Sequence, residues 1–216
     1  MAMAFLMQPF ELWWYPRRQQ VWLGEDGAAA TARLAGAGAA VTLLAAALAA
    51  LAGPVLIRVA TPAAYHPAAI LVPFVIVSLV LQSFGSLFNI GCYIGRTGRL
   101  PFLVNALAGG VALTGYALLI PRLGLAGAIA ATIAAQVVRL VAFARLSQRQ
   151  APVAYRHGAV AALAAAVAAA AALPQVLPPW TAAALALPVL AALAALAIRL
   201  GLLAVPRFGR TRPAAA

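Results

Sequence analysis

The chain has 216 residues, of which 66% are apolar and only 8% are charged. A soluble domain carries about 25% charged residues, so this composition excludes an ordinary water-soluble fold, whereas a bilayer can solvate so apolar an outer surface. The net charge of +12 does not indicate nucleic-acid binding, because the charges form short clusters between long apolar runs rather than one basic stripe. We therefore expect an all-α, polytopic membrane helical bundle.

The long apolar runs predict about six transmembrane helices, since a spanning helix needs about 20 mostly apolar residues. The first run covers 34–52 and reaches residue 59 if the Gly53-Pro54 pair only kinks the helix. Pro188 predicts a kink in the last run. In chain order, the expected spans are 34–52, 68–94, 101–120, 125–146, 159–173 and 181–203.

The first 15 residues are apolar and aromatic but too short to span a bilayer. They lack a basic n-region and a small-residue cleavage site, so they do not read as a signal peptide. Two interpretations stay open. The segment is either the last turns of a helix that begins upstream of Met1, with aromatic residues 13–15 at the interface, or an interfacial amphipathic helix.

These observations divide the chain into four parts. The expected parts are a partial helix end and cytoplasmic loop (1–33), a portion of four helices (34–146), the last two transmembrane helices (147–204) and a basic cytoplasmic tail (205–216).

All basic residues other than the two histidines are arginines, and they alternate between the predicted loops. Thirteen of the fifteen lie on alternate loops or their flanks, whereas the opposite loops hold only Arg58 and Arg122. Because Lys and Arg accumulate on the cytoplasmic side, this alternation predicts that both ends of the chain are cytoplasmic.

Glycine and proline predict where helices turn and pack closely. Pro121 ends one helix, and Gly124 permits the tight reversal into the next. Gly127 and the Gly91–Gly95 pair are small residues of the kind that allow close helix contact in membranes.

Polar side chains within the spans are the candidate site, because each is costly in hydrocarbon unless it faces protein or water. Ser78, Gln82, Ser86, Asn89 and Tyr93 recur every three to four residues, which predicts one helix face. These groups either form interhelical hydrogen bonds or line a hydrated cavity suited to sugar hydroxyls. The possible cavity residues are Gln82, Ser86, Asn89, Asn105, Gln136 and Arg139.

Arg139 lies about two turns inside the end of its span. Its side chain either extends to the cytoplasmic interface or faces the cavity, where a guanidinium group binds phosphate oxygens in a bidentate manner.

The sequence offers no enzyme chemistry. His66 and His157 fall in loops on opposite predicted faces, and neither has an acidic neighbour in sequence. Cys92 is the single cysteine, so a disulfide within the chain is excluded. No nucleophile motif, phosphate-binding loop or metal-ligand spacing occurs. We expect no catalytic residue, no cofactor and no metal.

Four stretches, in order, resemble the middle and C-terminal part of bacterial oligosaccharide flippases, the O-antigen and polysaccharide transporters of the multidrug/oligosaccharidyl-lipid/polysaccharide exporter superfamily. They are WYPRR with the GEDG loop (14–18 and 24–27), LIRVATPAAY followed by AAILVP (56–65 and 68–73), LIPRLGLAGA (119–128), and ARLSQR with Tyr155 (144–149). The helix-turn-helix match at 119–128 is the most specific.

The resemblance implies the C-terminal half of a transporter that moves polyprenyl-diphosphate-linked oligosaccharide across the bacterial inner membrane, for polysaccharide or lipopolysaccharide synthesis. It implies a cationic cavity, to which Arg139 would contribute. Its expected partners are the lipid bilayer, the lipid-linked oligosaccharide, and an N-terminal half or second membrane chain, because such transporters work by rocking two halves against each other.

The alternatives are a drug or cation exporter of the same superfamily, or a non-transporting membrane subunit or truncated remnant. Glu11, Glu25 and Asp26 all precede the first full span, which argues against coupling through a membrane-embedded carboxylate in this half. The family pattern also commonly has asparagines where this chain has Ala112 and Tyr116.

Overall fold

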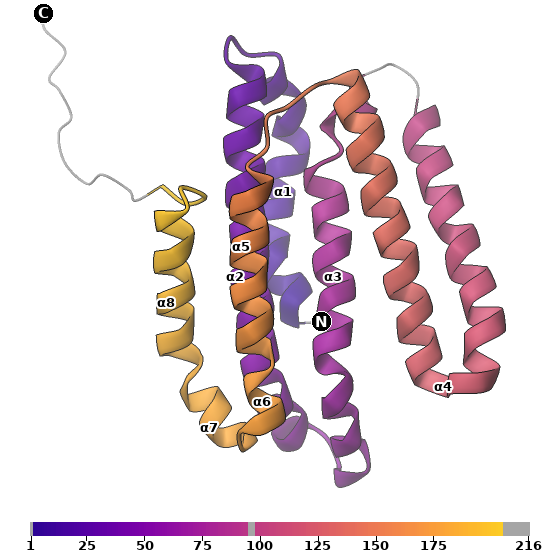
Figure 1. Cartoon of the computed structure of the whole chain (residues 1–216), viewed down its shortest axis with the longest axis vertical. Coiled ribbons are helices and arrows are strands. Elements are labelled where there is room, and N and C mark those ends of the chain that lie inside the picture. Colours follow the sequence, from indigo (N-terminus) through magenta and orange to yellow (C-terminus); the bar gives the residue numbers. More distant parts are fainter. Residues whose placement is uncertain (1, 95–97, 205–216) are drawn as a thin grey trace, which may run out of the picture.

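The computed structural model describes residues 2–94 and 98–204 of the chain, with side chains from residue 12 onward. Within these ranges the chain is helical and has no β-strand, which confirms the predicted all-α class. Figure 1 shows the long helices running side by side. The predicted tail 205–216, Gly95 and Arg96 lie outside the described residues.

Helix α1 (Ala2–Trp22) continues past the aromatic segment and lies along helix α2 (Gly27–Ala60). Arg17 and Arg18 therefore belong to this helix. Of the aromatic residues 13–15 that one interpretation places at the interface, Trp14 is 2% exposed and packs in the core, whereas Trp13 and Tyr15 are 41% and 40% exposed.

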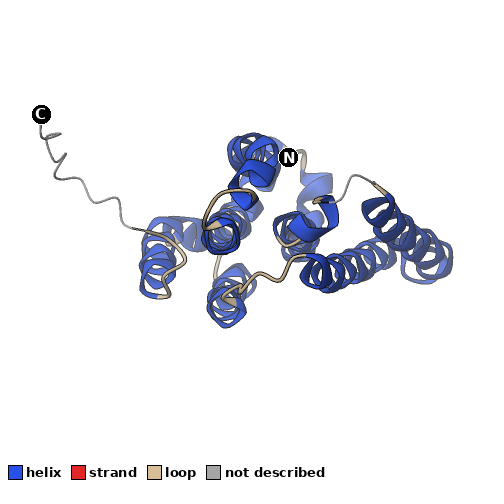
Figure 2. Ribbon diagram, turned by 90° about the horizontal axis from the view of Figure 1, so that it is seen from above, coloured by secondary structure: helices blue, strands red, loops and turns tan. Residues whose placement is uncertain are grey.

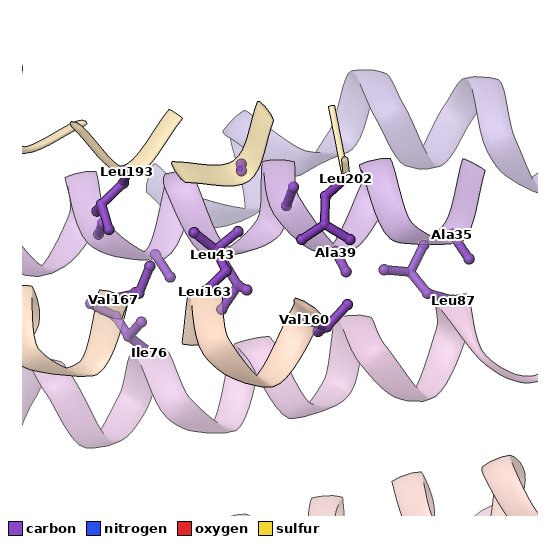
Figure 3. Packing of buried hydrophobic residues seen from close by; sticks show 14 of the residues in the cluster. Ala35, Ala39, Leu43, Ile76, Leu87, Val160, Leu163, Val167, Leu193 and Leu202 are labelled. Carbon is purple, nitrogen blue, oxygen red and sulfur yellow. The ribbon is translucent and has the colours of Figure 1, made fainter. Parts of the chain in front are cut away.

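Helix α2 is the centre of the bundle and contacts α1, α3, α5, α7 and α8. It passes through Pro54 without ending, which confirms the extension of the first span to residue 59. Ala35, Ala39 and Leu43 recur every four residues and form one buried face. Figure 3 shows side chains of neighbouring helices converging on this face. The alanines let the surrounding helices approach closely.

The predicted second span, 68–94, is not one helix. It consists of the 3-10 helix η1 (Ala63–Leu71), the helix α3 (Val72–Leu87) and the 3-10 turn η2 (Ile90–Tyr93). A contact with a distant segment accompanies the second break, after Leu87. The N–H of Gly91 donates to the Ser147 hydroxyl at 2.9 Å, and a Cβ at position 91 would overlap the Ser147 carbonyl. Gly91 is thus a packing glycine, as expected.

Helix α4 (Arg99–Gln150) is a hairpin of two arms, residues 99–123 and 125–150. Gly124 separates them with φ 57° and ψ −132°, a conformation that glycine adopts readily. A Cβ at Gly127 would overlap the Leu119 carbonyl. Both findings confirm the predicted reversal at Gly124, but the first arm continues through Pro121, which we expected to end it. Figure 2, seen along the helices, shows this hairpin at one edge of the bundle, where α4 packs mainly on α3 and η2.

The last third of the chain forms α5 (His157–Ala171), a short turn α6 (Leu173–Val176), and the pair α7 (Pro179–Ala184) and α8 (Ala186–Arg199). The predicted last span is therefore broken at Leu185. Pro188 explains the break, because it has no N–H to donate to the carbonyl of Ala184, four residues earlier. Helices α5 and α8 both pack on α2.

Four segments among the described residues are long and apolar enough to cross a bilayer, and α8 is a shorter apolar helix. These segments are Gly27–Ala60, Ala63–Leu87, Arg99–Gln150 and His157–Val176. Large apolar side chains such as Phe74, Phe102 and Leu113 are more than half exposed on the bundle's outer surface. The chain is therefore read as an integral membrane protein. The number of crossings stays a prediction.

The arginine-bearing ends of the helices lie together. The α1–α2 loop, the start of α4, the α4–α5 loop and the end of α8 all lie toward the upper end in Figure 1. The α2–α3 connection, which follows Arg58, and the α4 reversal, which contains Arg122, lie at the lower end. The fold therefore separates the two predicted groups of loops spatially.

Candidate functional site

A polar pocket of about 300 Å³ lies between the two arms of α4 and the neighbouring helix α3. Four predicted cavity residues line it: Gln82 from α3, Asn105 from the first arm, and Gln136 and Arg139 from the second arm. The rest of the lining is Ala108, Gly109, Ala112, Tyr116, Thr132 and Ala135. The hairpin thus brings together polar groups that are up to 57 residues apart in the sequence.

Arg139 is fixed in this pocket by its neighbours. Its Nε donates to the Oδ1 of Asn105 at 3.0 Å, and its Cζ lies 5.4 Å from the centre of the Phe143 ring. The Asn105 amide is itself held, because its Nδ2 donates to the Pro101 carbonyl at 2.8 Å. The Nη1 and Nη2 atoms of Arg139 make no hydrogen bond with any residue the structure describes. Arg139 therefore lines the pocket with its outer nitrogens available to a ligand.

A second contact between the two arms is made by two hydroxyl groups. The Tyr116 and Thr132 oxygens lie 2.9 Å apart. Thr132 donates its only hydroxyl proton to the Ala128 carbonyl at 2.9 Å, so Tyr116 is the donor in the pair. Both residues are eight positions from Gly124, one on each side. Equal spacing about a predicted reversal is the signal that places them opposite each other, although neither was among the six predicted cavity residues.

Gln136 contributes an acceptor with no partner. Its Oε1 atom is buried and receives no hydrogen bond from the described residues. A buried polar atom that makes no hydrogen bond is costly in free energy. Because this atom belongs to a residue that lines a pocket, we interpret the pocket as a ligand site and not as a closed contact between helices.

Two predicted cavity residues lie elsewhere. Ser86 donates to the Gln82 carbonyl at 3.3 Å and does not line the pocket. Asn89 is 2% exposed and accepts a hydrogen bond from Arg18 at 3.1 Å. The prediction of one face from Ser78 to Tyr93 is wrong at its end, because α3 stops at Leu87 and Asn89 turns toward α1.

Asn89 belongs to a buried cluster around Arg18 that the sequence analysis missed. The Arg18 guanidinium lies 4.1 Å from the centre of the Tyr93 ring and 5.2 Å from that of Tyr15. Gln19 donates to the Tyr93 carbonyl at 3.3 Å. Arg18 thus joins α1 to the turn before α4 through one hydrogen bond and two aromatic contacts.

The two histidines and the cysteine do not come together in one site. The Nε2 atom of His66 lies 3.2 Å from the Thr61 carbonyl, and the His157 ring packs against Phe88 and Tyr155. Cys92 is buried with Val104 and Phe143, as a small apolar side chain would be. Among the described residues, no three potential metal ligands come together.

No family model, no curated protein and no solved structure matches this chain. The resemblance to oligosaccharide flippases therefore depends on the four sequence stretches alone.

Proposed function

We propose that this chain is the C-terminal portion of a flippase that moves polyprenyl-diphosphate-linked oligosaccharide across the bacterial inner membrane. One observation carries the proposal. A positively charged, hydrogen-bonding pocket sits within otherwise apolar helices, and it contains a fixed guanidinium with free outer nitrogens. Charged groups in such positions typically mark a transport pathway.

The pocket matches the two parts of the proposed substrate. The outer nitrogens of Arg139 form a fork that suits two oxygens of a diphosphate. The amide groups of Gln82 and Gln136 offer donors and acceptors for sugar hydroxyl groups. None of the described residues that line the pocket is acidic, which favours an anion over the cationic substrate of a drug or cation exporter.

Transport also requires the pocket to open alternately to each side of the membrane. The proposal assigns that movement to this chain working against a second half or second membrane chain, as in other transporters built of two halves. The cytoplasmic end is proposed to be the upper end in Figure 1, where the arginine-bearing loops gather.

The first test is complementation. A strain of the source organism that lacks the gene should lose surface polysaccharide, and the wild-type gene should restore it. Arg139→Gln should fail to restore it. Arg145→Gln, which removes the same charge from the same arm outside the pocket, should succeed. Restoration by both variants contradicts the proposal.

The second test separates the diphosphate from the lipid tail. Binding of polyprenyl diphosphate and of polyprenol to the purified chain can be compared by native mass spectrometry. Arg139→Gln should weaken diphosphate binding about tenfold, the value of a lost charge-assisted bond, and leave polyprenol binding unchanged. Equal weakening of both ligands would show that Arg139 does not contact the diphosphate.

A further inference from the structure

A second cavity, of about 550 Å³, lies at the end of the bundle where α2 begins and α8 ends. One wall is made of the small residues Ala28, Ala29, Ala32 and Gly36 on α2. The other walls come from the α4–α5 loop and the segment after α8. Two arginines, Arg33 and Arg156, line the cavity, and none of the lining residues in the described part of the chain is acidic.

Arg156 is held in place by the end of α8. Its Nη1 donates to the Gly201 carbonyl at 3.1 Å. Gly201 has φ +65°, and the Leu202 N–H returns to the Ala197 carbonyl at 2.9 Å, a common glycine-based helix ending. A Cβ at position 201 would overlap Nη1 of Arg156. Glycine therefore both ends α8 and leaves room for the guanidinium group.

Arg33 faces the same cavity from α2. It is exposed and makes no hydrogen bond or ion pair with the residues that the structure describes. The nearest acidic residues in sequence, Glu25 and Asp26, precede α2. Asp26 lies seven residues before Arg33, about 10 Å along the helix. Within the described ranges, neither carboxylate pairs with Arg33 or Arg156. The positive charges of the two arginines are therefore available to a ligand.

We propose that this cavity binds a phosphate-bearing anion between Arg33 and Arg156. The small α2 residues leave space for the anion, and the first turn of α2 adds the positive end of a helix dipole. The cavity lies at the ends of helices long enough to span a bilayer, the depth at which lipid headgroups lie. The phosphate comes either from an anionic lipid headgroup or from soluble phosphate. This site is separate from the Arg139 pocket.

The test uses the full chain purified in detergent. Its thermal unfolding is followed while phosphatidylglycerol, phosphatidylcholine or inorganic phosphate is added. A ligand that binds only the folded state raises the unfolding temperature. We expect phosphatidylglycerol to raise it and phosphatidylcholine to have no comparable effect. A rise with inorganic phosphate as well indicates that the phosphate group alone suffices, and its absence indicates that a lipid headgroup is required.

The variants locate the site. The double variant Arg33→Gln with Arg156→Gln should weaken the apparent affinity for phosphatidylglycerol about tenfold or more. Arg149→Gln removes a charge at the same end of the bundle but outside the cavity. It should change the apparent affinity for phosphatidylglycerol less than twofold. An equal loss with Arg149→Gln, or no response to either anion, overturns the proposal.

A second measurement covers the case in which the double variant folds poorly. Native mass spectrometry counts the phosphatidylglycerol molecules that stay bound to each folded variant. Gly201→Ala, which displaces Arg156 without removing a charge, should lose the same bound lipid as Arg156→Gln. Retention of that lipid by both single variants would also overturn the proposal.

Discussion

Arg18 donates to the Oδ1 of Asn89 at 3.1 Å, which joins α1 to a segment 71 residues later. Arg18 is only 8% exposed, and Asn89 only 2%. A buried charge left without its hydrogen-bond partner is expensive. Together with the hydrogen bond from Gln19 to the Tyr93 carbonyl, this bond ties α1 to the turn between α3 and α4.

Asn89→Ala should destabilise the protein by about 2 kcal/mol, because it leaves an Arg18 donor buried and unpaired. The change is measured as a lower unfolding temperature in detergent. Asn105→Ala removes the same group from an exposed side chain and should cost less. An equal loss in both variants would mean that the burial of Arg18 does not matter.

Gln136→Leu should separate stability from transport. The variant removes a buried acceptor that has no partner among the described residues, so the unfolding temperature should be unchanged or higher. Restoration of surface polysaccharide should nevertheless fall. A large loss of stability with normal transport would instead identify Gln136 as a structural hydrogen-bonding residue.

Three glycines of α4 should respond differently to alanine. Gly124→Ala should cost about 1–3 kcal/mol through backbone strain alone, because φ is +57° and no atom lies within 4 Å of an added Cβ. Gly127→Ala should also destabilise, since its Cβ would overlap the Leu119 carbonyl. Gly109→Ala, in open space, should be neutral or slightly stabilising. Similar unfolding temperatures for all three variants would contradict this hairpin geometry.

Tyr155→Phe should stabilise the protein by about 1 kcal/mol, because the Tyr155 hydroxyl is buried without a hydrogen-bond partner among the described residues. Burial also raises the pKa of Tyr155. Above the ordinary tyrosine pKa of about 10, the unfolded chain loses this proton while the folded chain keeps it, so wild-type stability should fall as pH rises. The advantage of Tyr155→Phe should therefore be larger at pH 11 than at pH 8. A constant advantage would contradict the shifted pKa.

Cysteine labelling tests the proposed orientation. Cys92 is 2% exposed, so the wild-type thiol should react slowly with a membrane-impermeant maleimide. Ala64→Cys, in η1, should be labelled in intact cells. Gln150→Cys, at the opposite end of the bundle, should be labelled only after the cells are permeabilised. The reverse pattern would place the arginine-bearing end outside.

Local sequence patterns predicted most of the helices but not how distant segments meet. Apolar runs located α2, the two arms of α4 and α5, and Pro121 with Gly124 located the reversal. The break after Leu87 could not be predicted in the same way, because it depends on Gly91 meeting Ser147, 56 residues away.

The residues of the candidate site were likewise predicted only where local sequence patterns decide their position. Gln82, Asn105, Gln136 and Arg139 were identified because polar groups are costly within apolar helices. Asn89 fits the same helical spacing, yet it lies elsewhere, because its position is set by Arg18 on α1. Periodicity assigns a residue to a face only as far as its helix continues.

The position of the α4 hairpin has a mechanical consequence. All the described residues that line the polar pocket, except Gln82, belong to this one hairpin. A swing of α4 about its contacts with α3 and η2 would carry Arg139, Asn105, Tyr116 and Thr132 together, with their mutual hydrogen bonds intact. Among the described lining residues, Gln82 alone would change its distance from the rest of the pocket in such a movement.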